Sequence, residues 1–146
     1  MTHISGGKLR VMRLAKAVTL ALTLTACVTA REASWKTVPD VAMSYDRAWS
    51  IVTNAVTQRF DLETSDAQSG YLRTEWKVTG KDILNAPIRK SRVIVRVEER
   101  NPFRVKVKAE KQELNVLTDE WVITGNDEAV EGDIMGELQG RLRASR

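Results

Sequence analysis

Residues 92–111 read RVIVRVEERNPFRVKVKAEK, and this stretch decides the fold. Apolar residues take every second position on both sides of an Asn101-Pro102 turn. Such alternation is typical of strands with one buried face, and two alternating runs joined by a turn predict a hairpin. The side predicted to face inward carries Val93, Val95, Val97, Val105, Val107 and Ala109.

Two pairing registers of this hairpin keep valine beside valine or alanine. The first sets Val97 opposite Val107 and matches the apolar residues better. The second, shifted by two residues, sets Arg96 opposite Glu110 and matches the charges better. A one-residue slip is excluded because it would exchange the two faces of a strand.

The other side of the hairpin is rich in basic residues. We take four of them, together with a tryptophan near the start of the domain, as candidate binding residues for phosphates or an acidic partner: Arg92, Arg96, Lys106, Lys108 and Trp35. The alternative is a solvated face on which Glu75, Glu98 and Glu110 balance the cations, since each cross-strand pair contributes only about 0.2–1 kcal/mol.

Helical periodicity appears on both sides of the strand region. Apolar residues in residues 44–60 recur at steps of three and four, with Ser44 as the expected N-cap. Residues 126–143 repeat the pattern, with Asn126 or Asp127 as the expected N-cap. The apolar stripe of this helix consists of Val130, Ile134, Met135, Leu138 and Leu142. Gly132, Gly136 and Gly140 form a row on this second helix, which predicts close approach of another backbone.

The remaining segments complete an antiparallel sheet. Residues 35–38 predict an opening strand, residues 60–78 a hairpin, residues 79–90 a long loop, and the stretch around Trp121 a last strand. Because each strand has one apolar face, we expect an α+β fold of two layers, with both helices packed on one face of the sheet. Trp49 and Trp76 are expected in the core against Val95 and Val107, and Trp35 is expected to be exposed.

The N-terminal residues have the layout of a secretory signal. Lys8, Arg10, Arg13 and Lys16 precede a short apolar run that ends in the only cysteine, Cys27. The sequence Leu24-Thr25-Ala26-Cys27 resembles a bacterial lipobox, so we expect removal of residues 1–26 and lipidation of Cys27. Residues 27–34 then form the lipidated end and a tether, and residues 35–146 form one domain.

Composition argues against several classes of function. The only histidine is His3, inside the expected signal, and a lipidated Cys27 leaves no free thiol. Histidine- or thiolate-based catalysis and the usual zinc sites are therefore not expected, and no phosphate-binding motif is present. The four basic residues of the signal account for the whole formal charge of +4, so the neutral remainder gives no case for nucleic-acid binding. We expect no catalytic residue, no cofactor and no metal.

A family resemblance covers about residues 35–143. The helix type SYDRAWSIV, the run from Asp66 to Trp76, the basic R-V-x-V-R-V strand and a late tryptophan, Trp121, before the last helix are similar to the repeated domain of the BamC (NlpB) outer-membrane lipoproteins. The chain differs from that family in having one such domain and no long unstructured N-terminal segment.

The resemblance implies a helix-grip-like domain that serves as an accessory subunit of an envelope assembly. The expected function is that of an outer-membrane lipoprotein with a protein-interaction domain in the periplasm, held to the membrane by its lipid and bound to an envelope protein partner. The alternative is a periplasmic binding domain for anionic lipid, lipopolysaccharide or peptidoglycan.

Overall fold

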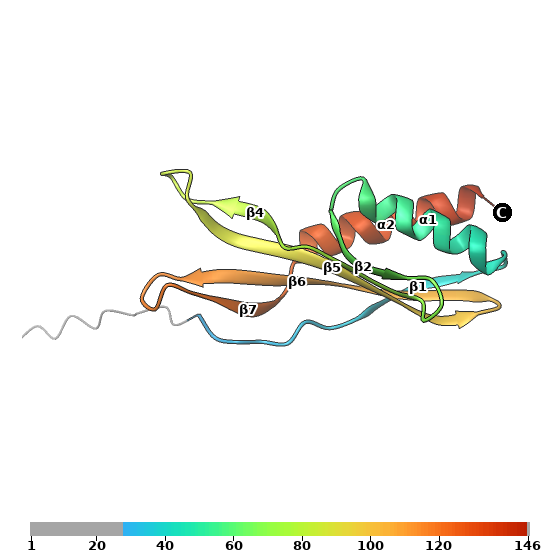
Figure 1. Cartoon of the computed structure of the whole chain (residues 1–146), viewed down its shortest axis with the longest axis horizontal. Helices are drawn as coiled ribbons and strands as arrows, with labels where there is room; N and C mark the ends of the chain where they lie inside the picture. Colours follow the sequence, from blue (N-terminus) through green and yellow to red (C-terminus); the bar gives the residue numbers. More distant parts are fainter. Residues whose placement is uncertain (1–27, 146) are drawn as a thin grey trace, which may run out of the picture.

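The computed structural model describes residues 28–145, and these residues form the predicted α+β fold. One seven-stranded antiparallel sheet carries two helices on one of its faces (Figure 1). The strands are β1 (Lys36–Val41), β2 (Leu62–Asp66), β3 (Tyr71–Thr74), β4 (Lys77–Lys81), β5 (Pro87–Arg100), β6 (Phe103–Asn115) and β7 (Glu120–Asn126). The helices are α1 (Tyr45–Thr57) and α2 (Glu128–Ala144).

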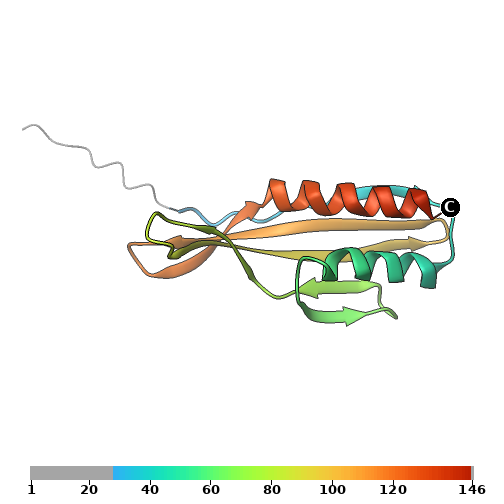
Figure 2. The same cartoon turned by 90° about the horizontal axis from the view of Figure 1, so that it is seen from above.

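A long ribbon of β5 and β6 runs through the whole sheet. One half of β6 pairs with β1 and the other half with β7, while β5 pairs with β3 in one half and with β4 in the other. The helices cover the half of the ribbon that lies beside β1 and β3, and the β4–β5 and β6–β7 hairpins extend beyond them (Figures 1 and 2).

Both registers predicted for the β5–β6 hairpin are wrong. The structure pairs Val95 with Val107 and Val97 with Val105. At the tight turn Arg100 lies opposite Phe103, a register that would continue to place Val97 opposite a lysine. A register shift between Val97 and Glu99 moves the pairing by one residue and restores valine to valine. Because a one-residue shift exchanges the faces, this β-bulge keeps the apolar side of both strands in the core.

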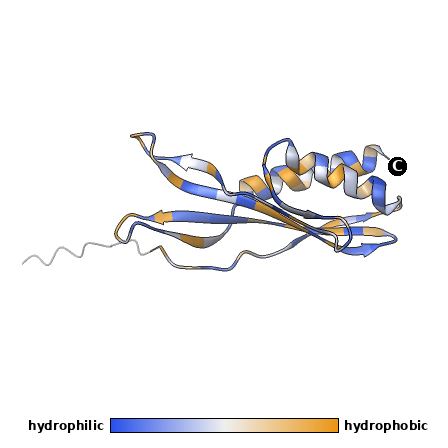
Figure 3. Cartoon of the chain, in the orientation of Figure 1, coloured by the Kyte–Doolittle hydropathy of each residue, from blue (hydrophilic) through white to orange (hydrophobic). Residues whose placement is uncertain are grey.

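The core forms between the valine side of the ribbon and the two helices. α1 contributes Ala48, Trp49, Val52 and Val56, which are at most 9% exposed, and α2 contributes Ile134, Leu138 and Leu142, which are fully buried. Met135 and Val130 pack at the edge of this cluster, so the predicted stripe of α2 is confirmed. Figure 3 shows the apolar residues of the helices and of the ribbon in the layers that form this core.

Trp76 is not in this core, contrary to the sequence prediction. The predicted strand through residues 71–78 is divided into β3 and β4, and the two parts pair with β5 in registers that differ by one residue: Leu72 lies opposite Val95, but Lys77 lies opposite Ser91. This shift moves Trp76 from the helix side of the sheet to the other side. Its ring is half-buried there, 4.5 Å from the Arg92 guanidinium.

The predicted long loop at residues 79–90 is wrong as well, because β4 and β5 form a hairpin there. Its turn is fixed by Asp82, whose Oδ1 accepts hydrogen bonds from the N–H groups of Leu84 and Ala86 at 2.9 and 2.8 Å. Asn85 has the positive φ of 65° that such a turn needs, and asparagine tolerates this conformation well. Residues 82–86 therefore form a tight turn between two paired strands, and the composition of residues 79–90 did not distinguish this turn from a long loop.

Among the described residues no other backbone approaches the glycine row of α2, contrary to the sequence prediction. Gly132, Gly136 and Gly140 lie on the exposed side of the helix, and a Cβ atom added to any of them would meet nothing within 4 Å. Gly70 behaves differently because its φ is +68° and an added Cβ would lie 2.7 Å from the Cβ of Val97.

Alanine at Gly136 should therefore stabilise the protein. Gly136→Ala is expected to raise the free energy of unfolding by about 0.5–1 kcal/mol, since glycine costs that much in a helix interior. Gly70→Ala is the matched control and should lower it, because the new methyl group clashes in an unfavourable backbone conformation. Chemical denaturation of both variants measures the two effects, and a destabilising Gly136→Ala would contradict an open helix face.

Candidate functional site

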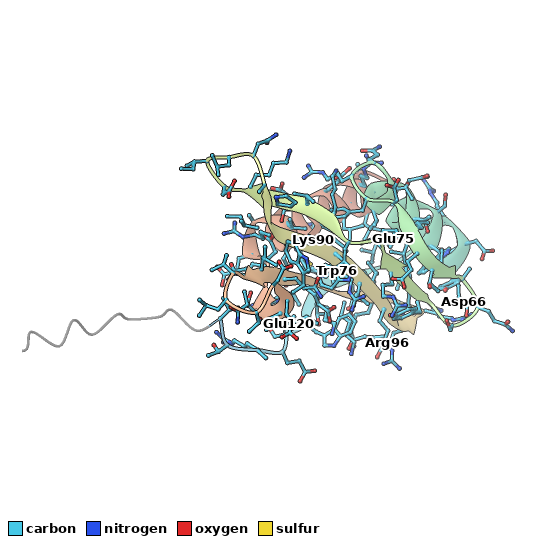
Figure 4. The ribbon with its side chains drawn as sticks, turned by 60° about the vertical axis from the view of Figure 1, so that its left-hand side comes forward. Asp66, Glu75, Trp76, Lys90, Arg96 and Glu120 are labelled. Carbon is cyan, nitrogen blue, oxygen red and sulfur yellow. The ribbon has the colours of Figure 1, made fainter. Side chains whose placement is uncertain are left out.

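The candidate binding residues lie on the sheet face that points away from the helices, called here the outer face. Strand alternation places them there, because Val93, Val95 and Val107 are fully buried on the helix side. Three tryptophans lie on the outer face: Trp35 just before β1, Trp76 between β3 and β4, and Trp121 in β7. The ribbon residues of the outer face are Lys90, Arg92, Ile94, Arg96, Lys106, Lys108 and Glu110. Figure 4 labels Lys90, Trp76 and Arg96 across this part of the sheet.

Each of the three tryptophans lies beneath a cation. The Lys90 Nζ is 4.1 Å from the centre of the Trp121 ring, and Lys106 and Lys108 lie 5.2 and 5.0 Å from that of Trp35. Such cation–π contacts contribute about 0.5–1 kcal/mol at exposed sites and more where water is excluded. All three rings are half-buried, so Trp35 is less exposed than predicted.

Glu110 is the central acid of the outer face. It is 7% exposed, and its carboxylate oxygens contact the guanidinium of Arg92 at 2.7 Å and the ammonium of Lys108 at 2.8 Å. Burial by itself would raise the pKa of Glu110, but the hydrogen bonds and charges of Lys108 and Arg92 outweigh it and hold the pKa below its ordinary value. The ionised form is therefore favoured in the folded protein.

The outer face is thus less basic than the sequence alone indicates. Arg92 and Lys108 are engaged by Glu110, and Lys106 lies 3.1 Å from Glu98. Arg96 is exposed and forms no ion pair with any residue between 28 and 145. Of the four candidate cations, three have partners inside the domain and one presents its charge to solvent.

The second half of the predicted tether lies against the domain. The N–H of Arg31 donates to the carbonyl of Ile123 at 2.9 Å, and the N–H of Ser34 donates to Asn126 Oδ1 at 2.8 Å. Ala33 is 5% exposed. This segment runs parallel to β7 and borders a hollow of about 340 Å³ beside Lys108, Glu110 and Ile123. The polar composition of residues 31–34 gave no sign of this packing.

A larger polar hollow lies where β7 passes into α2. Its volume is about 800 Å³, and its lining combines the cations Arg31, Lys36, Arg89 and Lys111 with the acids Asp127, Glu128 and Glu131. Asp127 is not available to a ligand, because Ser91 donates to its Oδ2 at 2.5 Å and the N–H of Val130 donates to its Oδ1 at 3.2 Å. Asp127 is thus the N-cap of α2 and joins the helix to the ribbon. This hollow was not predicted from the sequence.

Two further findings concern residues 28–145. No cluster of histidine, cysteine, aspartate and glutamate in this part of the chain could hold a metal ion. No helix formed by these residues is long and apolar enough to cross a membrane. Cys27 and the predicted signal at residues 1–26 lie outside the described residues.

A scan of the sequence against protein-family models gives no match, and a search of curated proteins gives none either.

Removal of the charge on Glu110 should make the free energy of unfolding less dependent on pH in the acid range. Glu110→Gln is expected to cost on the order of 1–3 kcal/mol near pH 7, because Arg92 and Lys108 lose their shared charged acceptor. The lowered pKa means that ionised Glu110 stabilises the fold above about pH 4.5, its ordinary pKa, and that this contribution is lost as the pH falls further. The difference between wild type and variant should therefore shrink on acidification.

Denaturation curves between pH 7 and pH 3 measure this difference. Glu98→Gln is the matched control, since Glu98 is exposed and should change stability by less than about 1 kcal/mol. A penalty for Glu110→Gln that stays constant down to pH 3 would show that the charge of Glu110 is not what stabilises the outer face.

Proposed function

We propose that this chain is an outer-membrane lipoprotein whose domain binds an envelope protein partner and performs no catalysis. In this proposal Cys27 carries the lipid, residues 35–146 form the interaction domain in the periplasm, and the protein is an accessory subunit of an envelope assembly. The BamC-like pattern of the sequence and the lipobox motif support this role.

The outer face is the observation that carries the interaction proposal. Tryptophan and arginine are the residues most enriched at the energetic centres of protein interfaces. Trp35, Trp76 and Trp121 are held half-buried on a sheet face that neither α1 nor α2 covers, and each ring contacts a cation. A face whose side chains are already ordered loses little conformational entropy when a partner binds.

A second candidate function rests on the polar hollow beside α2. Arg31, Lys36, Arg89 and Lys111 bring four cations to one cavity, which favours an anionic headgroup or a glycan phosphate. The three carboxylates in the same lining reduce this positive charge. Protein binding on the outer face therefore remains our first proposal.

Charge reversal of Arg96 tests the interaction proposal. Because Arg96 is exposed and has no ion pair among the described residues, Arg96→Glu should change stability by no more than about 0.5 kcal/mol. A photo-crosslinker placed at the exposed Thr37 of β1, opposite Lys106, should trap one envelope protein in living cells, and Arg96→Glu should weaken that capture.

Arg47→Glu is the matched control, since Arg47 is an exposed arginine of α1 on the opposite layer. Equal capture in both variants would remove the interaction site from the outer face. Lipopolysaccharide binding that survives Arg96→Glu and is lost in Lys36→Gln with Lys111→Gln would favour the polar hollow instead.

The lipid anchor predicts a processing defect. Cys27→Ala should leave the signal attached and hold the precursor at the inner membrane, because no thiol remains to be lipidated. Val28 is not the aspartate that retains enteric-type lipoproteins at the inner membrane, so the wild type should fractionate with the outer membrane. Mass spectrometry of the purified protein gives the N-terminus, and residues 24–26 found intact in it would contradict lipidation.

A further inference from the structure

The two hairpins that extend beyond the helices end in exposed aliphatic pairs. At the β4–β5 turn, Ile83 is 100% and Leu84 82% exposed, and at the β6–β7 turn, Val116 is 78% and Leu117 68% exposed. Both turns lie at the same end of the molecule and are apolar at their tips in Figure 3. Among the described residues, no other large apolar side chain is more than half exposed.

These aliphatic side chains are not needed to form the turns. In the first turn the Asp82 side chain accepts hydrogen bonds from the backbone. In the second turn the Asn115 Oδ1 accepts a hydrogen bond from the N–H of Leu117 at 3.1 Å, and the backbone carbonyl of Asn115 accepts one from the N–H of Asp119 at 2.8 Å. In both turns an Asp or Asn residue is followed directly by two aliphatic residues. Polar residues at these positions would leave the turn hydrogen bonds in place, and exposed apolar patches are typical of surfaces that contact a partner or a membrane.

The described chain begins at this same end. Arg31 bridges Thr124 in the parallel direction, so residues before Arg31 run back toward the Glu120 end of β7. Figures 1 and 2 place the start of the described chain beside the β6–β7 turn. The proposed lipid site, Cys27, is bonded directly to Val28, and adjacent Cα atoms are only about 3.8 Å apart. A lipid on Cys27 would therefore enter its bilayer close to the β6–β7 turn, at the end of the molecule that carries both hairpin tips.

We propose that the two hairpin tips, Ile83-Leu84 and Val116-Leu117, insert into the interface of the lipid bilayer that anchors the protein. This inference rests on the proposed lipidation of Cys27. The tips carry no surplus of positive charge, since Lys81 and Asp82 flank one and Asp119 and Glu120 flank the other. Insertion is thus driven by apolar burial rather than by anionic headgroups.

The residues behind the tips fit the headgroup layer. Trp121 follows the second turn closely and lies beneath Lys90 of the neighbouring hairpin. Tryptophan and lysine, with an apolar body and a polar end, are suited to the boundary between lipid and water. With its tips inserted, the ribbon stands away from the membrane and the helix end points into the periplasm.

Depth-dependent quenching tests this arrangement on the lipidated full-length protein. Cys27 is the only cysteine and its thiol would be blocked by lipid, so Leu84→Cys and Leu117→Cys each provide one site for an environment-sensitive fluorophore. In vesicles of phosphatidylethanolamine and phosphatidylglycerol with nitroxide-labelled lipid, both labels should be quenched and shifted to shorter emission wavelength. The matched control is Ala67→Cys in the β2–β3 turn, whose label should show neither effect.

A second variant tests whether the tips act together. Ile83→Ser with Leu84→Ser should reduce quenching of the label at residue 117, while thermal unfolding stays unchanged because these side chains are exposed. Quenching should also persist in high salt, since the proposed contact is apolar.

The possible outcomes separate this inference from the proposed function. Lipidated protein bound to vesicles with tip labels as unquenched as the control overturns the inference and leaves the anchor standing. A tip crosslinker that traps a protein in cells, combined with unquenched labels, assigns the tips to a protein partner and also overturns it. Purified protein without lipid on Cys27 overturns both the anchor and the inference.

Discussion

The pairing of Val95 with Val107 and of Val97 with Val105 is the constraint on which the other elements depend. It sets the two longest strands in a ribbon with one side of valines, and this side receives α1 and α2. The edges of the same ribbon are where β1, β3, β4 and β7 attach. A slip of one residue would expose the valines and bury arginine and lysine without partners, at a cost that a domain of this size could not offset.

Two one-residue shifts give the outer face its composition. The bulge between Val97 and Glu99 keeps the valine pairs aligned after the tight turn, so Lys106 and Lys108 remain on the outside. The shift between β3 and β4 brings Trp76 to the same side, where its ring lies beneath the Arg92 guanidinium. Lys106 and Lys108 of β6 both lie over the ring of Trp35, and Glu110 forms ion pairs with Arg92 and Lys108. Arg92, Lys106 and Lys108 thus have partners within the domain, and Arg96 is the cation of this face that presents its charge to solvent.

The fold class, both helices and the inward face of the ribbon could be predicted because hydrophobic periodicity reports directly which side of an element is buried. The burial of Ile134, Leu138 and Leu142 follows from their spacing alone.

The strand registers could not be predicted, since every shift by two residues keeps valine beside valine and nothing in the composition marks the bulge at residue 98. Trp76 was misplaced for the same reason: its side depends on a break in pairing, not on the alternation of its neighbours. The outward position of the candidate cations follows from strand alternation, but their ion pairs depend on the register. The packing of residues 31–34 and the polar hollow depend on contacts between segments that are distant in the sequence.

The length of the ribbon separates stability from surface chemistry. Its helix-covered half contains most of the buried apolar residues, whereas the hairpin half is held by strand pairing, by the bond between Ser91 and Asp127 and by turns fixed through Asp82 and Asn115. Substitutions at the tips and at Arg96 therefore act on side chains that the core does not use. Changes in the helix-covered half act on close packing, where even one methylene group is felt. Because α1 and α2 cover only one face and one end of this elongated sheet, the residues of the other face and the other end are not constrained by the core. Their identity can therefore reflect what they contact, and for this reason the aliphatic tips and the tryptophans beneath cations are informative about function.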